Sequence, residues 1–482
     1  MDWLDHLAEF WPYLVAGFSF LAALLASAHA LLNKRDSRAA VLWIGLIWLL
    51  PAVGPVLYIA LGINRIRRHG KSLRVRRRPS NVTPQPIPKD MGEPKSIEAA
   101  HLRMLARVVD RVASRPLLAG NRVQALVNGD EAFPSMLAAI EEAKTSVSLA
   151  TYIFDNDRSG GQFVEALGRA VARGVEVRVL VDDAGARYSW PSIVGKLKHA
   201  NVRVARFLPT LAPWRLTTMN LHNHRKSLVV DGRVGFTGGI NIREGNVLAD
   251  KPRRPVRDLH FKVEGPVVVQ LQEAFANDWE FCTKEVLAGD VWFPKLKESG
   301  KIIARVIIDG PDADFEKARM TLLGALACAQ SSVQVLTPYF LPDQSLITAL
   351  NLAALRGVQV DIILPAESNL PFVHWASRAM WWQVLERGCR IWLTPPPYDH
   401  SKLMIVDNHW VFLGSANWDP RSLRLNFELN MECYGREFAD RMEAILKNKL
   451  RAARKVTLKE VDSRPLPLRL RDNIARLFTP YL

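Results

Sequence analysis

The chain has 482 residues, which excludes a protein built around one compact core and indicates at least two domains. Its 64 Lys and Arg residues outnumber its 48 Asp and Glu residues, giving a net charge of +16. Such an excess favours an anionic partner, which is either nucleic acid or a membrane surface with anionic lipid.

Two long apolar segments begin the chain. Residues 10–33 and 39–63 contain no Lys, Arg, Asp or Glu. Each is long enough to cross ~30 Å of hydrocarbon at ~1.5 Å per residue. The acidic start (Asp2, Asp5, Glu9) argues against a cleaved signal peptide. We therefore predict a transmembrane hairpin over residues 1–63, with spans at about 13–32 and 39–63; the alternative is two buried helices of a soluble core.

Basic and then Pro-rich residues follow over 64–100, and we interpret them as a linker that lies partly against lipid headgroups. The larger basic cluster follows the second span, which predicts that the large C-terminal portion is cytoplasmic. The loop between the spans is also basic and weakens this prediction. Four cysteines without metal-site spacing (Cys282, Cys328, Cys389, Cys433) agree with a reducing compartment.

Beyond the linker the chain repeats itself. The run 146–152 matches 332–339, and the run 173–181 matches 356–364. Both 173–181 and 356–364 are typical of a helix end, a Gly cap and a buried strand. Apolar strands that alternate with helices predict an α/β fold with a sheet covered on both faces. We expect two tandem domains with pseudo-twofold symmetry over 101–300 and 301–450. A basic segment, 451–482, follows, whose end is either an interfacial segment or a helix packed on the second domain.

The repeat is sharpest where polar residues interrupt the apolar pattern. In both halves Lys follows His by two residues, Asp by seven, Gly by fourteen and Asn by seventeen. The catalytic candidates in these motifs, 224–231 and 400–407, are His224, Lys226, Asp231, His400, Lys402 and Asp407. Two chance copies with the same downstream spacing are improbable, so the motifs predict one shared active site.

Strand geometry explains the spacing. Residues i and i+2 of a strand face the same side, so each His and its Lys are expected to face one pocket. The apolar residues that follow predict a buried strand, which Asp231 or Asp407 then ends at a turn. We therefore assign these two aspartates a structural role in preference to a catalytic one.

Further polar residues complete the site. Each half supplies a later acid, Asp258 or Glu428, and both are candidate partners that fix a histidine tautomer. Asn241, Asn417 and Ser415 are candidate phosphate-binding donors beside the lysines. The absence of an acid-rich cluster argues against a metal site.

The paired motifs are followed by Gly-Gly-Ile-Asn at 238–241 and by Gly-Ser-Ala-Asn at 414–417. Together these features resemble those of the phospholipase D superfamily. The apolar spans and the runs 337–340, 375–378 and 421–428 are similar to those of bacterial cardiolipin synthases. The resemblance implies two phospholipase D-type domains, no metal or other cofactor, and a place in the bacterial inner membrane. It also implies that two phosphatidylglycerol molecules become cardiolipin and glycerol, with His224 as nucleophile and His400 as acid and base.

Other activities on this fold stay open. A phospholipase D-type hydrolase would release phosphatidic acid, and another phosphatidyltransferase would take, for example, phosphatidylethanolamine as donor. A nuclease is the less favoured alternative, because much of the positive charge adjoins the apolar spans and not the motifs. Anionic membrane lipid is therefore the expected partner, and nucleic acid is not.

Overall fold

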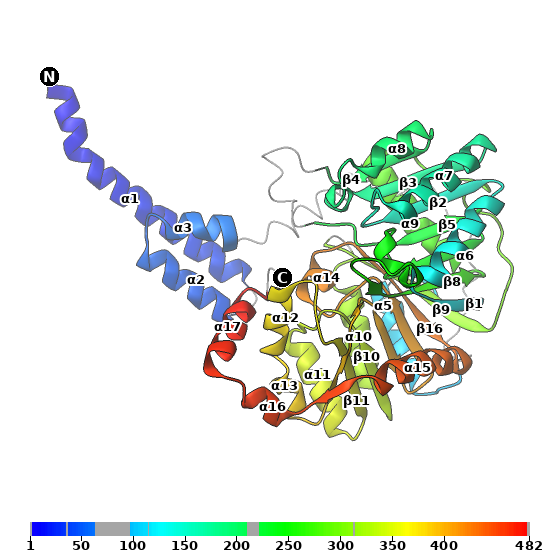
Figure 1. Ribbon diagram of the computed structural model, residues 1–482. Coiled ribbons are helices and arrows are strands. Elements are labelled where there is room, and N and C mark those ends of the chain that lie inside the picture. Colours follow the sequence, from blue (N-terminus) through cyan, green and yellow to red (C-terminus); the bar gives the residue numbers. More distant parts are fainter. Residues whose placement is uncertain are drawn as a thin grey trace. The chain divides into compact units, whose positions relative to one another are not determined.

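A computed structural model describes residues 2–34, 37–62, 97–113, 115–209, 221–311 and 314–479 (Figure 1). The chain divides into two compact units, Met1–Ser72 and Leu73–Leu482. Most of the predicted linker, 64–96, lies outside the described residues. The predicted domain boundaries stay predictions.

The first unit is a small helical assembly. Helix α1 spans Asp2–Asn33, α2 spans Ser37–Leu49, and a short helix α3 (Gly54–Leu57) runs into one π-helical turn, Tyr58–Gly62. Buried alanines on α1 pack against Ile47 and Tyr58. Small residues at this contact allow the helices to approach closely, as in membrane helix pairs.

One described helix is long and apolar enough to cross a membrane, at Phe10–Asn33. The predicted second span, 39–63, is not a continuous helix, because α2 ends at Leu49 and the chain turns over 50–53. Pro51 lacks the N–H that would continue the helix. The 13 residues of α2 cover only ~20 Å at ~1.5 Å per residue. A two-pass hairpin therefore stays a prediction.

The second unit is built on a 15-stranded sheet. The first half contributes β1 (Leu118–Val127), β2 (Ser146–Thr151), β3 (Glu176–Asp182), β4 (Arg203–Phe207), β5 (Ser227–Val230), β6 (Val234–Gly238) and β8 (Leu259–Glu264). The second half contributes β9 (Ile302–Asp309), β10 (Ser332–Leu336), β11 (Gln359–Pro365), β12 (Arg390–Thr394), β14 (Leu403–Val406), β15 (Trp410–Gly414), β16 (Glu428–Tyr434) and β17 (Arg454–Val456). Strands β7 (Val256–Arg257) and β13 (Tyr398–Asp399) form a separate two-stranded sheet.

The strand order shows the duplication directly. The first half runs β1-β8-β6-β5-β2-β3-β4, and the second runs β9-β16-β15-β14-β10-β11-β12, with β17 added at the edge. Each strand of one order has its counterpart at the same place in the other. The halves join where β1 pairs antiparallel with β9. The predicted α/β fold with two phospholipase D-type repeats is confirmed.

Helices cover both faces of the sheet (Figure 1). The described helices of this unit are α5 (Leu102–Ala113), α6 (Asn128–Glu142), α7 (Arg158–Ala172), α8 (Ile193–His199), α9 (Val268–Thr283), α10 (Lys317–Cys328), α11 (Gln344–Leu355), α12 (Pro371–Arg378), α13 (Trp382–Leu385), α14 (Pro420–Arg424), α15 (Arg436–Arg451), α16 (Leu458–Asp462) and α17 (Leu466–Leu477). Alternate residues of a strand face opposite layers. In β10, Val333 and Val335 join the core of α10 and α11, whereas Leu336 joins the core of α9 and α15. Burial on both faces explains why such strands are mostly apolar.

Candidate functional site

Both histidines lie immediately before the central strand of their half. Strand β5 begins after Lys226 and β14 begins after Lys402, so each His-x-Lys segment precedes its strand. The prediction that these segments lie within the strands is wrong. Each lysine nevertheless lies beside its histidine. Lys226 Nζ donates to the carbonyl of His224 at 2.6 Å, and Lys402 Nζ is 2.9 Å from His400 Nδ1.

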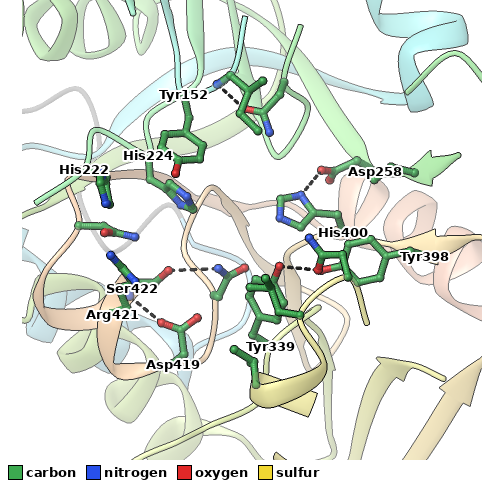
Figure 2. A pocket seen from close by; sticks show the side chains of 18 of the residues that line it. Tyr152, His222, His224, Asp258, Tyr339, Tyr398, His400, Asp419, Arg421 and Ser422 are labelled. Carbon is green, nitrogen blue, oxygen red and sulfur yellow. Dashed lines mark hydrogen bonds and ion pairs between the residues drawn. The ribbon is translucent and has the colours of Figure 1, made fainter. Parts of the chain in front are cut away.

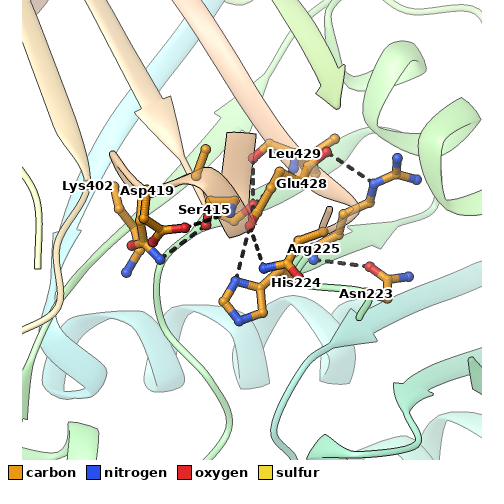
Figure 3. A network of polar contacts seen from close by, with 12 residues as sticks. Asn223, His224, Arg225, Lys402, Ser415, Asp419, Glu428 and Leu429 are labelled. Atoms are coloured by element: carbon orange, nitrogen blue, oxygen red, sulfur yellow. Dashed lines mark hydrogen bonds and ion pairs between the residues drawn. The ribbon is translucent and has the colours of Figure 1, made fainter. Parts of the chain in front are cut away.

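Each histidine pairs with the acid of the other half. His400 Nδ1 is 2.8 Å from Asp258 Oδ2, and His224 Nδ1 is 3.2 Å from Glu428 Oε1 (Figures 2 and 3). Both carboxylates are buried, with Asp258 1% and Glu428 0% exposed. The two acids expected to support the histidines are thus both at the site, and they cross between the repeats.

The backbone explains the crossing. Strand β13 leads into His400 and pairs with β7, which leads into Asp258. In the same way, Asn223 forms a parallel bridge with Phe427. These two residues directly precede His224 and Glu428, so the bridge brings that histidine and that acid together. The side chain of Arg225 adds a link between the halves, because its Nε donates to the carbonyl of Glu428 at 3.2 Å.

A pocket of about 490 Å³ opens at this junction, and both histidines line it (Figure 2). Because Nδ1 of each ring faces a carboxylate, Nε2 is the nitrogen left for chemistry. The rings come from opposite halves and point toward one another in the figure. Two nitrogens placed this way can act on one reacting centre from its two sides.

Burial and positive neighbours keep the histidines neutral. Burial first, and then Lys226, lowers the pKa of His224 to about 4. Burial first, and then Lys402, lowers the pKa of His400 well below its ordinary value of 6.5. Burial also lowers the pKa of Lys226 to about 8 and that of Lys402 to about 7. An anionic ligand beside these cations would raise the pKa values of the histidines and lysines again, because it favours their charged forms.

The two acids differ in their affinity for protons. Burial raises the pKa of Asp258 to about 6, although Lys402 opposes the shift. Burial acts on Glu428 too, but the nearby His224 and Lys226 and the Ser415 hydroxyl outweigh it and lower the pKa of that carboxyl. Of the two acids, Asp258 therefore holds a proton more readily than Glu428.

The two asparagines lie at the pocket wall. Asn241 Oδ1 accepts the backbone N–H of Ile153 at 3.1 Å, which fixes its amide. Asn417 donates to the hydroxyl of Ser422 at 3.2 Å, and its own Oδ1 is buried without a hydrogen-bond partner. A buried polar atom of this kind at a pocket indicates a place for a polar ligand.

Close packing requires glycine at the ends of β6 and β15, just before Asn241 and Asn417. Gly238 has φ 150° and Gly414 has φ 147°, and a Cβ at either position would lie 2.6 Å or less from a carbonyl oxygen. A Cβ at Gly239 would lie 2.2 Å from Asp258 Oδ1. The equivalent residue, Ser415, is buried away from the pocket and donates to Glu428 Oε2 at 2.5 Å (Figure 3).

The motif aspartates lie at the far end of the strands. Asp231 accepts from the backbone N–H groups of Lys144, Thr145 and Ser146 and from the hydroxyl of Thr145. Asp407 accepts the equivalent four bonds from residues 330–332, and a ring nitrogen of His101 lies 2.7 Å from its carboxylate as a fifth partner. Both have φ 51°. Each lies five residues beyond its Lys, or ~16 Å at ~3.3 Å per residue, and neither lines the pocket.

Several pocket residues were not predicted from the motifs. Tyr152 and Tyr339 end the two matched runs, and their rings lie 4.5 Å and 6.2 Å from His224 and His400. His222 and Tyr398 each precede a catalytic histidine by two residues and also line the pocket. Equal spacing in the two repeats was the available signal. Arg421 and Asp419 carry no such signal, because their counterparts differ in the first half.

The family described as "Cardiolipin synthase, PLD-like domain" matches residues 136–279 and 322–450, and "Phospholipase_D-nuclease N-terminal" matches residues 21–62. A cardiolipin synthase A of Pseudomonas putida (strain W619) is 30% identical over 99% of this chain and 99% of its own length. The cardiolipin synthase A of Pseudomonas syringae pv. syringae (strain B728a) is 32% identical over 99% of both chains. A cardiolipin synthase of Geobacillus kaustophilus (strain HTA426) is 31% identical and covers 94% of this chain and 90% of its own length.

Among solved structures, the phosphatidylserine synthase of Haemophilus influenzae has the same fold. It covers 78% of this chain and 100% of its own, with a TM-score of 0.63 and 14% identity. The matched domains, the full-length relatives and the paired motifs agree with one another. The chain therefore belongs to the cardiolipin synthase family of phospholipase D-like phosphatidyltransferases.

Proposed function

We propose that this cardiolipin synthase joins two phosphatidylglycerol molecules into cardiolipin and releases glycerol, through a phosphatidyl-histidine intermediate. The observation that carries the proposal is the facing pair of histidines, each held by a buried carboxylate from the other repeat. Two such histidines provide one nucleophile and one proton carrier, as a two-step exchange of a phosphodiester requires.

In the first step, Nε2 of His224 attacks the phosphorus of one phosphatidylglycerol. A P–N bond forms, the P–O bond to the headgroup glycerol breaks, and His400 gives that oxygen a proton. The low pKa of His224 keeps this ring neutral and nucleophilic. The raised pKa of Asp258 keeps a proton available at the His400 pair.

In the second step, His400 removes a proton from a headgroup hydroxyl of the second phosphatidylglycerol. The freed oxygen attacks phosphorus, the P–N bond breaks, and His224 returns to its starting form. One phosphodiester replaces another, and the proton given in the first step is recovered in the second. The chemistry is therefore balanced without an external energy source.

Cations and amides stabilise the charge that develops on the phosphoryl oxygens. Lys226 and Lys402 are placed beside the two histidines, and Asn241 and Asn417 lie at the pocket wall. Fixed donors in a site shielded from water lower the barrier because they need no reorganisation. We assign Asp231, Asp407 and Ser415 to supporting roles, because their side chains hold backbone or Glu428 instead of facing the pocket.

The family and the apolar helix at Phe10–Asn33 indicate membrane association. We further propose that residues 39–63 complete a second pass of the bacterial inner membrane and that the catalytic unit is cytoplasmic. The basic excess after residue 63 supports this orientation. Protease protection of residues 97–482 in right-side-out vesicles tests it, and digestion of the catalytic unit from outside would contradict it.

Product analysis tests the reaction. The purified full chain in detergent micelles is given phosphatidylglycerol that is labelled in its headgroup glycerol, and we expect one free glycerol for each cardiolipin. Phosphatidic acid as the main product would instead identify a hydrolase, and release of ethanolamine from added phosphatidylethanolamine would identify a different donor.

Single substitutions test the two-histidine mechanism. His224→Ala and His400→Ala should each abolish cardiolipin formation, because each removes a group that no other described side chain replaces. Substantial synthesis by either variant would refute the mechanism. Metal-independent DNA cleavage that is lost in His224→Ala would indicate a nuclease.

A further inference from the structure

Helix α17 carries an apolar face that its own unit leaves uncovered. Leu466, Leu470, Ile474 and Leu477 recur at intervals of four, four and three residues, which places them on one side of a helix. They are 65%, 55%, 56% and 72% exposed, and Phe478 beyond the helix end is 48% exposed. We call these five residues the α17 stripe.

The opposite side of α17 is fastened to the catalytic unit. Asp472 and Ala475 are fully buried there. Arg464 Nη1 donates to Asp472 Oδ2 at 2.6 Å, and the guanidinium of Arg471 lies 4.4 Å from the ring centre of Trp375 on α12. These contacts hold α17 alongside α12 (Figure 1), so the direction in which the stripe faces is fixed.

The stripe is continuous with the rim of the pocket. The ring of Phe478 lies 5.5 Å from that of Phe372, with an interplanar angle of 62°. Phe372 and its neighbour Leu370 line the pocket that contains both histidines, and they are 38% and 46% exposed. Apolar side chains thus connect the outer face of α17 with the lining of the pocket.

The charges beside the stripe are positive. Helix α17 carries Arg469, Arg471 and Arg476, whereas its one acid, Asp472, is buried and paired with Arg464 and Arg471. Arg469 and Arg476 lie on the side of the helix that borders the stripe. An apolar face with basic flanks is the pattern of helices that lie in the surface of an anionic membrane.

We propose that the α17 stripe docks the catalytic unit on the surface of an anionic bilayer and brings the pocket rim to the lipid headgroups. This inference rests on the proposed lipid substrate and adds the place at which lipid enters. The stripe would lie ~5–10 Å below the headgroup level, as other interfacial helices do. Phe372 and Leu370 would then contact the acyl chains of an entering phospholipid.

A spin label measures this directly. The full chain, with Cys282→Ser and Cys328→Ser, receives a nitroxide at Ile474→Cys and is reconstituted in vesicles of phosphatidylglycerol and phosphatidylcholine. We expect the label to be reached by oxygen but shielded from a water-soluble nickel complex. Access to nickel would overturn the proposal. Shielding from both reagents would also overturn it, because the stripe would then be covered by protein.

The control position is Leu355, an equally apolar residue on α11 that is 64% exposed. A label at Leu355→Cys should be reached by the nickel complex. The same membrane signal at both positions would overturn the assignment to α17. In vesicles of phosphatidylcholine alone the label at position 474 should be less deeply placed, and an unchanged depth would overturn the role of the arginines.

An activity ratio provides the second test. Leu470→Glu with Ile474→Glu should lower about tenfold the ratio of the rate on vesicular phosphatidylglycerol to the rate on dissolved short-chain phosphatidylglycerol. An unchanged ratio would overturn the docking role, and Leu355→Glu is the matched control. Failure of the proposed function is distinguishable, because the unmodified chain would then form no cardiolipin from either substrate.

Discussion

Replacing Asp258 by Asn should damage the chemistry of His400, although the two residues belong to different repeats. The carboxylate lies 2.8 Å from His400 Nδ1, and Lys402 Nζ lies 2.9 Å from the same atom. At an effective dielectric constant of about 20, unit charges 2.8 Å apart interact by about 6 kcal/mol. The amide removes this attraction and leaves the repulsion from Lys402 on an imidazolium.

If half of that energy is expressed in the transition state, the barrier rises by about 3 kcal/mol and the rate falls more than about 100-fold. The informative assay uses a phosphatidyl ester of p-nitrophenol, whose leaving group departs without a proton. Asp258→Asn and His400→Ala should then both retain a rapid burst of p-nitrophenolate. Glu428→Gln and His224→Ala should both lose it.

The grouping of variants is the decisive result. If Asp258→Asn behaves like His224→Ala, and Glu428→Gln like His400→Ala, each acid serves the histidine of its own repeat and the crossed arrangement is refuted. The comparison does not depend on which histidine is the nucleophile. If the roles are exchanged, His224→Ala and Glu428→Gln would both retain the burst and His400→Ala and Asp258→Asn would both lose it. Each histidine variant would still behave like the variant of the acid from the other repeat.

Three further predictions concern stability and packing. Asp231→Asn should lower the free energy of unfolding by about 1.5–3 kcal/mol, because the charge on its hydrogen bonds is lost; urea unfolding measures this, and a large fall in the synthesis rate of the folded variant would contradict a structural role. Asp258 binds its proton more tightly in the folded than in the unfolded chain, so wild-type stability falls as pH rises from about 4 to about 6. Asp258→Asn should therefore be more stable above pH 6 by up to about 3 kcal/mol, a gain that vanishes toward pH 4; equal stability at all pH values would disprove it. Gly239→Ala should lose activity, because its Cβ displaces the carboxylate that holds His400, whereas Gly161→Ala, with open space at its Cβ, should not.

The repeat could be predicted from the sequence because its signals are local. Strands β5 and β14 are short, mostly apolar runs of four residues that are followed by an aspartate with positive φ, and all eight strand residues are buried. The helix-ending glycines, Gly174 and Gly357, likewise have φ 86° and 88°. Each of these features is set by steric preferences of a few neighbouring residues.

The pairing of acids and histidines could not be predicted in this way. Asp258 and Glu428 were identified as acids of the two halves, but their partners depend on which backbone segments lie side by side. The bridge from Asn223 to Phe427 joins residues that are far apart in the chain, and no periodicity reports it. The bend after α2 is a similar case, because membrane helices tolerate proline kinks and Pro51 alone does not show that the helix ends before it.

The crossed pairing of the histidines also bears on how the enzyme comes into being. During translation the first repeat leaves the ribosome with His224 but without Glu428, and with Asp258 but without His400. The one ring already made, that of His224, then lacks the carboxylate that fixes its tautomer. It follows that an incomplete chain carries no competent catalytic centre. The lipids around the nascent protein are therefore not exposed to a half-built enzyme that would transfer their phosphatidyl groups to water.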